Sequence, residues 1–227
     1  MKRIFLIVIA VLFVSTGLFA QNCEAYIPTE TGVKHTFKTS NKKGKVQSYY
    51  SQELLSKKNE DGGTIFEILH TNYDDKKEVV GQDTLEFICK DNMFFIDMGS
   101  YLNEEQMGAY DESQIEVTFD NIGYPANLKP GSTLKDGYVQ ADINVGMTLT
   151  FKTEIQNRKA VAYEDITTEA GTFKTIKVTE DLSSKIGFIN VKMSTISWVK
   201  MNIGNIRTEN YDKKGNLSSV TELISIE

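Results

Sequence analysis

The chain has 227 residues, of which 31 are acidic and 25 are Lys or Arg, so its formal net charge is −6. An acidic balance of this kind argues against nucleic acid and against anionic lipid surfaces as electrostatic partners. The length suffices to bury a substantial single core, and it lies in the range in which an all-β domain stays one unit.

The first 20 residues have the pattern of a secretory signal peptide. Lys2 and Arg3 precede an uninterrupted apolar stretch that is short for a membrane span. We expect cleavage after this segment, so that the exported chain begins at Gln21, carries a net charge of −8 and has no transmembrane span. The signal therefore predicts a periplasmic or extracellular protein with a single β-rich domain over residues 21–227.

Two other fates of the N-terminus stay open. Leu18 stands where a small residue is expected before the cleavage point, so an uncleaved segment that anchors the chain is one alternative. The second is a lipoprotein acylated on Cys23, although Asn22 occupies the position where such processing needs a small residue. These residues favour export of a soluble chain over both alternatives.

The two cysteines of the chain are Cys23 and Cys89, and export carries both into an oxidising compartment. We expect a disulfide between them, on compartment and even count. Such a bridge would close a loop of about 65 residues and stabilise the fold by roughly 4 kcal/mol on the chain-entropy estimate. The alternative is two separate thiols, one of them buried.

Three segments show the two-residue apolar alternation of a half-buried β-strand, at 33–37, 115–119 and 147–155. After the signal, the best helical candidate is short, at 103–110. Turn signals separate the apolar segments, among them Asp61-Gly62-Gly63, Asp74-Asp75-Lys76, Asn157-Arg158 and Ala170-Gly171. We therefore predict an all-β fold, an antiparallel sandwich or an open half-barrel of about 10–13 strands with minor helix.

A polar tetrad occurs twice, as Asn-Lys-Lys-Gly at 41–44 and as Asp-Lys-Lys-Gly at 212–215. Asn or Asp at the first turn position accepts a backbone hydrogen bond, and glycine takes the left-handed conformation that other residues resist. Two exposed lysines are too few for a phosphate-binding surface in an acidic chain. Both tetrads are therefore predicted to be hairpin tips.

Several strands are apolar on both faces, as at 189–201, where Val199 falls on one side and Trp198 on the other. Such a sheet needs a cover over its second face or has a cavity there. The Gly- and Pro-interrupted stretch near 99–137 is the expected cover, as a long irregular connection inside one domain. Whether the chain fills the space beneath it stays open.

Catalytic and metal-binding patterns are missing from the sequence. The two histidines, His35 and His70, lie in different predicted strands, and no His/Cys cluster has metal-ligand spacing. No nucleophile elbow, dinucleotide fingerprint or phosphate loop occurs. We expect no enzymatic activity, no cofactor and no metal site. The rival is a hydrolase that uses one histidine beside a carboxylate.

Two segments carry a distinctive order of motifs: the turn around Gly171 in 164–178, then Trp198, a Gly-centred turn and the Asp-Lys-Lys-Gly hairpin in 196–223. In these motifs, and in 22–32 with the Lys-Lys-Gly hairpin after it, the chain resembles the TapB-like family of secreted Bacteroidota proteins, a domain of unknown function, over most of residues 23–223. It implies an exported, mostly antiparallel β protein of the cell envelope, with no enzymatic residues to carry over. Trp198 suits an apolar anchor between sheet layers.

Two functions follow from these observations. The first is a non-enzymatic envelope protein that holds a lipid or another apolar ligand in a cavity between the sheet and its cover, with ligand-binding residues unknown. The alternative is a ligand-free structural or protein-interaction module of the envelope. Cavity volume discriminates the two, because sites for such ligands enclose roughly 300 to 1,000 Å³.

Overall fold

A computed structural model of the chain describes residues 24–227 apart from 61, 103–107 and 188. These residues form thirteen strands and two short 3-10 helices. The first half contains β1 (Lys34–Asn41), β2 (Val46–Glu60), β3 (Gly63–Tyr73), β4 (Val79–Lys90), β5 (Met93–Ile96), η1 (Met98–Tyr101), η2 (Glu112–Gln114), β6 (Ile115–Asp120) and β7 (Ile122–Pro125). The second contains β8 (Gly137–Asn144), β9 (Thr148–Thr168), β10 (Gly171–Ile186), β11 (Ile189–Lys200), β12 (Gly204–Asp212) and β13 (Leu217–Ile226).

All thirteen strands belong to one antiparallel sheet, in the order β6-β8-β9-β10-β11-β12-β13-β1-β2-β3-β4-β5-β7. The fold is therefore all-β, as predicted, and the strand number lies within the expected range. It is a single sheet curled into a nearly closed barrel, so the two separate sheets of a sandwich do not occur among the described residues.

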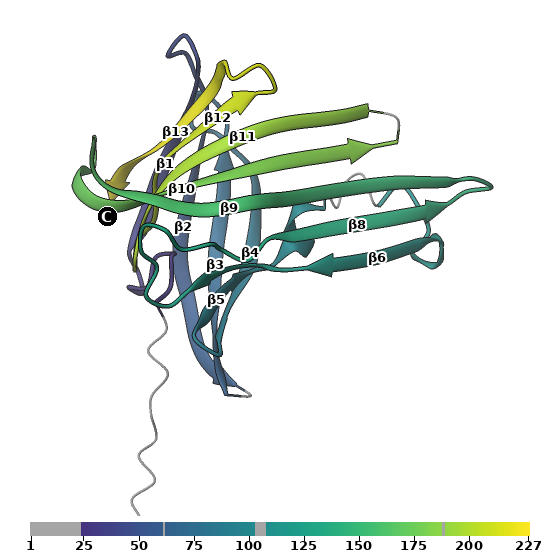
Figure 1. Cartoon of the computed structure of the whole chain (residues 1–227), viewed down its shortest axis with the longest axis horizontal. Coiled ribbons are helices and arrows are strands. Elements are labelled where there is room, and N and C mark those ends of the chain that lie inside the picture. The colour runs from purple at the N-terminus through teal and green to yellow at the C-terminus, as the bar shows by residue number, and fades with distance from the viewer. Residues whose placement is uncertain (1–23, 61, 103–107, 188) are drawn as a thin grey trace, which may run out of the picture.

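The two halves of the sheet cross steeply. In Figure 1, β2, β3 and β4 run from top to bottom, whereas β8, β9 and β10 run from left to right. The halves meet where β1 pairs with β13, and at the start of this seam Lys34 and Glu227 exchange two backbone hydrogen bonds of 2.7 and 3.0 Å. The space between the crossing halves contains the main hydrophobic core.

The two edge strands of the sheet are consecutive in the chain. β6 pairs with β8 at one edge, and β7 pairs with β5 at the other, with only Asn121 between β6 and β7. The Asn121 side chain accepts a hydrogen bond of 2.9 Å from the backbone N–H of Met98. Lys135 Nζ donates to the Asn121 carbonyl and to Asp120, both at 2.6 Å. The chain thus crosses from one edge to the other at a single, well-bonded residue.

Both Lys-Lys-Gly tetrads are hairpin tips, which confirms the prediction. Asn41 Oδ1 accepts from the backbone N–H of Lys43 and Lys45, and Asp212 Oδ1 accepts in the same way two and four residues ahead. A third tip at 74–78 repeats this geometry, with Lys77 at φ 68° where the other two have glycine. These tips need no ligand to explain their composition.

Some local predictions were wrong. Asn157-Arg158 is not a turn, because β9 continues through it as a bulge in which Asn157 has φ 57°. The stretch expected to be irregular at 99–137 includes the two short strands β6 and β7. The helix candidate at 103–110 lies mostly outside the described residues. The predicted signal peptide, Gln21 and Cys23 lie outside them as well.

The two-residue alternation of apolar residues located the strands correctly, but it did not determine which of their side chains are buried. Ile155 is buried, as the pattern of 147–155 predicts, whereas Met147 at the other end of that segment is 71% exposed. Val117 and Phe119 lie on one side of β6, and both are about half exposed. The outer end of the sheet formed by β6, β8, β9, β10 and β11 therefore leaves apolar side chains uncovered.

Candidate functional site

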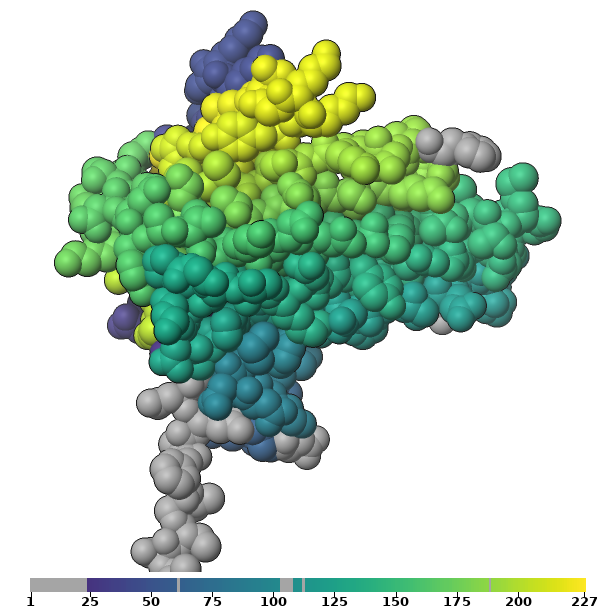
Figure 2. Space-filling view, in the orientation of Figure 1, coloured from purple at the N-terminus to yellow at the C-terminus, as the bar shows by residue number. Residues whose placement is uncertain are grey.

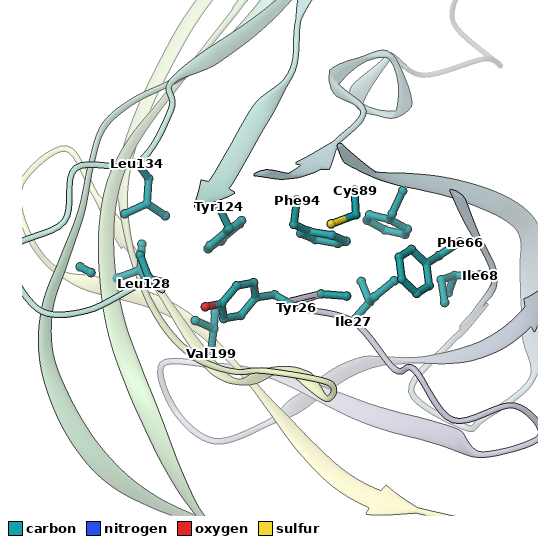
Figure 3. Close-up of a cluster of buried hydrophobic side chains, with 14 of the residues drawn as sticks. Tyr26, Ile27, Phe66, Ile68, Cys89, Phe94, Tyr124, Leu128, Leu134 and Val199 are labelled. Carbon is teal, nitrogen blue, oxygen red and sulfur yellow. The ribbon is translucent and has the colours of Figure 1, made fainter. Parts of the chain in front are cut away.

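The space enclosed by the curled sheet is filled by the chain itself. Ala25, Tyr26 and Ile27, which precede β1, lie between the two crossing halves and are buried. Figure 3 shows Tyr26 and Ile27 between the side chains of β3 to β5 and those of β11 and the β7–β8 connection. The Tyr26 ring lies 5.0 Å from the Tyr124 ring, centroid to centroid. The N-terminal segment is thus a plug in the barrel.

The β7–β8 connection and β5 complete this packing. Leu128 and Leu134 come from the connection and are buried against the same cluster, and Phe94 of β5 stacks on Phe87 of β4 with ring centroids 5.8 Å apart. Met98 of η1 packs in a second cluster with Ile122, Val139 and Ile155. A region expected to surround a ligand is therefore occupied by side chains.

A buried arginine is the principal charged group inside this packing. Arg158 has no exposed surface, and its Nε lies 3.0 Å from Glu180 Oε2 on the neighbouring strand β10. Nη1 donates to the carbonyls of Gly123 and Lys135, at 3.0 and 2.7 Å. The guanidinium also lies over the ring of Tyr124, at 4.7 Å from its centroid. Arg158 thereby ties β9 and β10 to β7.

Arg158 and Tyr124 of this cluster are both shielded from solvent. Burial raises the pKa of the Tyr124 hydroxyl, so the phenol stays protonated beside the guanidinium. The Arg158 side chain is neutralised by Glu180 and shielded from solvent. Nη2 of Arg158 has no hydrogen-bond partner among the described atoms, but its burial leaves no surface on which a substrate could reach it. The arrangement fixes the edge strand β7 in place.

The two histidines occupy one row of the sheet, since both His35 and His70 lie opposite Gln52 in the strand register. His35 Nδ1 donates to the Ile203 carbonyl at 3.2 Å, and His70 Nε2 donates to Asn72 Oδ1 at 3.1 Å. Burial lowers the pKa of both side chains. Neither forms a hydrogen bond to a carboxylate within the described part of the chain, although Glu30 acts through space on His35 and Asp83 on His70.

Trp198 is buried, and polar groups surround its indole. Its Nε1–H donates to Glu164 Oε2 at 2.7 Å, and this bond is the main cause that lowers the pKa of Glu164. Lys177 and Arg207 lie over the ring, at 5.2 and 6.0 Å from its centroid. The indole is therefore covered by polar side chains of β9, β10 and β12, and cation–π contacts hold the cluster together.

An open polar groove of about 840 Å³ runs across β9, β10, β11 and β12 and is bounded by the β12–β13 tip. In its floor, Asp181 accepts hydrogen bonds from Asn157 Nδ2 at 2.9 Å and from Ser194 Oγ at 3.1 Å. Tyr211 and Lys213 line the side formed by the tip. The Asp181 carboxylate thus links β10 to β9 and β11 across the floor of the groove.

Within residues 24–227 as described, no three His, Cys, Asp or Glu side chains are grouped so as to hold a metal ion. Over the same residues, no helix has the length and apolarity to cross a membrane. Cys89 is buried in the main core, and its expected disulfide partner Cys23 precedes the described residues, so the bridge stays a prediction.

Comparison with known proteins gives a family and a fold. A family model described as DUF3108-like matches residues 30–223. The expected TapB-like assignment is not confirmed by this match. No curated protein matches the chain.

Two solved structures share the fold. One, from Bacteroides fragilis, is described as an exported protein with a YmcC-like fold. It is 21% identical, with a TM-score of 0.71 over 90% of this chain and 100% of that one. The other, described as a lipoprotein from Parabacteroides distasonis, is 23% identical, with a TM-score of 0.73 over 91% of this chain and 100% of that one. At these identities the likeness concerns the fold alone.

Proposed function

The chain belongs to the DUF3108-like family, and from this premise we propose that it is a non-enzymatic exported protein of the cell envelope that acts through its outer surfaces. The descriptions of the two similar structures, an exported protein and a lipoprotein, support the envelope location. The apolar signal-like segment 1–20 supports it independently.

One observation carries the choice between a carrier and a surface-acting module, namely that the interior is already occupied. Tyr26 and Ile27 fill the space between the crossing halves of the sheet, and Leu128 and Leu134 close it from the side. Packed interiors leave voids hardly larger than a water molecule, whereas a lipid needs several hundred Å³. A lipid could enter only if this plug left, so the interior is better suited to holding the sheet in shape.

The absence of enzymatic activity is part of the proposal. Among the described residues, two buried polar side chains form structural bonds, Arg158 to Glu180 and two carbonyls and His35 to Ile203, and the exposed Asp181 accepts from Asn157 and Ser194. General acid–base catalysis needs a titrating group within reach of a substrate. The groove over β9 to β12 offers hydrogen-bonding contacts for a polar partner, and this supports a role in binding at the outer surface.

Native mass spectrometry of protein purified gently from its own envelope tests the proposal. We expect the mass of the protein alone and no lipid in an organic extract. A co-purifying lipid whose removal lowers the melting temperature would overturn the proposal that the protein acts only through its outer surfaces. A ligand that binds only the folded state must stabilise that state. The variant Ile27→Ala is a useful control, since it opens space in the plug without touching the outer surface.

A further inference from the structure

The hairpins β8–β9 and β10–β11 end in apolar residues that face solvent. Val145 and Met147 flank Gly146 in the first tip, and Met147 is 71% exposed. Ile186 and Ile189 flank the second tip, and Ile189 is 66% exposed. Apolar side chains in such positions are unusual because turns are normally built from polar residues and glycine. We call the two hairpin ends that carry these four residues the apolar tips.

The rest of the chain shows what its ordinary tips look like. The tips that begin at Asn41, Asp74 and Asp212 each have a carboxylate or amide that accepts two backbone N–H groups, followed by lysines. The Val145–Met147 turn is instead closed by a backbone hydrogen bond of 3.1 Å from Val145 N–H to the Met147 carbonyl. Its turn chemistry therefore does not require exposed apolar side chains.

The two apolar tips are neighbours at one end of the molecule. Gly187 N–H donates to the Thr150 carbonyl at 3.0 Å, and Ile186 lies opposite Phe151 in the register. The β8–β9 tip extends about three residues farther, roughly 10 Å at the rise of a strand. Figures 1 and 2 show the β8–β9 hairpin projecting at the right-hand end of the molecule, away from β1 to β5.

Lysines follow immediately behind the apolar tips. Between Asn144 and Lys152 the chain has no charged residue, and the segment around the second tip is bracketed by Lys185 and Lys192. Lys152 and Lys185 lie directly opposite each other on β9 and β10. Like charges in this position repel one another, so an anion bound beside them would relieve the repulsion.

The acidic groups nearby only partly neutralise these lysines. Glu154 pairs with Lys152 at 2.7 Å. Asp142 accepts from Thr150 Oγ1 and Gln140 Nε2, both at 2.6 Å, and these bonds lower its pKa. Lys185 and Lys192 have no ion-pair partner among the described residues. Glu116, opposite Asp142 on β6, is a third carboxylate at this end, so carboxylates and lysines are equal in number there, and Lys185 and Lys192 are the cations that no described residue holds in an ion pair.

We propose that this end of the sheet docks on a lipid surface, with the apolar tips among the acyl chains and Lys152, Lys185 and Lys192 at the headgroup phosphates. The order of the side chains along the hairpins, apolar at the tip and cationic behind it, matches the change from hydrocarbon to headgroup at a membrane surface. The projecting shape favours a fluid lipid bilayer as the partner, because a protein partner would need a hollow of matching shape. Two such convex ends cannot cover each other, which argues against a second copy.

This inference deepens the proposed function, on whose envelope location it rests, but its test is separate. Binding is measured by co-sedimentation of the full protein, as recovered from the envelope, with phosphatidylethanolamine vesicles with and without one part in five phosphatidylglycerol. We expect binding to both, and stronger binding to the anionic vesicles. An absence of binding to either would overturn docking, whether or not the native mass experiment finds the interior empty.

Met147→Asp combined with Ile189→Asp is expected to weaken binding at least tenfold, because a carboxylate at each tip opposes insertion. Val79→Asp combined with Val80→Asp is the matched control: these residues are 63% and 66% exposed but lie on β4, in the other half of the sheet. It should bind as the unchanged protein does. The variants and the unchanged protein have the same segment before residue 24. Any vesicle binding by that segment is therefore the same in all of them and does not affect the comparison. Equal binding by the tip variant and the control would overturn the proposal.

The variant Lys185→Glu tests whether this lysine contributes to vesicle binding without a change in the stability of the folded protein. It places a carboxylate opposite Lys152 but removes the attraction between Lys185 and Asp142, so these two effects oppose each other and the stability should change little. Binding to the anionic vesicles should nevertheless fall, by about fivefold for loss of the cation and further for the added anion. If Lys185→Glu left binding unchanged while the circular dichroism and melting temperature were native, headgroup contact by these lysines would be refuted.

Discussion

Glu180 Oε2 lies 3.0 Å from Arg158 Nε, and it is the carboxylate that neutralises a guanidinium without any exposed surface. Glu180→Ala is therefore expected to destabilise the protein by about 3–5 kcal/mol, because it leaves a buried charge unpaired. Glu180→Gln should cost less, since the amide oxygen still accepts from Nε. Urea unfolding of both variants measures the difference, and equal midpoints would show that the pair contributes no charge compensation.

Gly137 is expected to tolerate no side chain. A Cβ atom there would lie 2.4 Å from the Asp120 carbonyl and 2.8 Å from Ile122, at the point where the chain crosses between the two edges of the sheet. Gly137→Ala should therefore destabilise by about 1–3 kcal/mol through overpacking. Gly81 is the control position: it also lies in a strand, and a Cβ there meets nothing within 4 Å. Gly81→Ala should leave the urea midpoint unchanged or raise it.

Stability should fall as the pH drops below about 6.5, because of the two histidines. Burial lowers the pKa of His35 and of His70 below the ordinary value of 6.5. The unfolded chain then binds more protons than the folded one in this range. The contribution of the two neutral histidines to the free energy of unfolding is therefore fully present above about pH 6.5 and is lost on acidification. The slope is at most about 1.4 kcal/mol per pH unit for each histidine.

The variant pair His35→Asn and His70→Gln tests this origin, since each amide nitrogen can replace the ring N–H that donates to Ile203 or Asn72. Melting temperatures between about pH 7.5 and 5.0 should vary less in the double variant than in the unchanged protein. The carboxylates with lowered pKa, such as Asp212 and Glu67, act at more acidic pH and are unaffected. An unchanged slope in the double variant would assign the pH dependence elsewhere.

The Cys23–Cys89 bridge is expected to leave no alkylatable thiol in unfolded, unreduced protein. Mass spectrometry after treatment with iodoacetamide should show no added groups, and reduction should then allow two. Loss of the bridge in Cys23→Ser should lower the stability by roughly 4 kcal/mol at most, the chain-entropy value for a loop of this length. Two alkyl groups on the unreduced protein would contradict the bridge.

Local sequence patterns predicted the strands and the tips, because both depend on neighbouring residues. The tetrads at 41–44 and 212–215 form tips since Asn41 and Asp212 bond only to groups within four residues. The same reasoning misread Asn157-Arg158 as a turn. A left-handed Asn157 also serves a bulge inside a long strand, and only the pairing of β9 with β10 distinguishes the two.

The filled interior could not be predicted from the same patterns. Tyr26 and Ile27 lie in an irregular segment without a two-residue period, so nothing in their spacing indicates that they enter the barrel. Arg158 gave no signal either, since a charged residue is usually exposed and its partner Glu180 is 22 positions away. Alternation showed that 115–119 and 147–155 have an apolar face, but not whether another part of the molecule covers it.

The seam between β1 and β13 sets the order in which this barrel can assemble. Strands β1 to β4 and β8 to β13 are two runs of hairpins, each built from contacts close in the chain, whereas the seam joins segments from opposite ends of the described residues. Contacts of large sequence separation form slowly, since loop closure precedes any gain from pairing. The two runs should therefore become structured first, and the seam should join them afterwards. An exported chain emerges N-terminus first, so the first run is present before β13, with the edge of β1 unpaired and open to foreign strands.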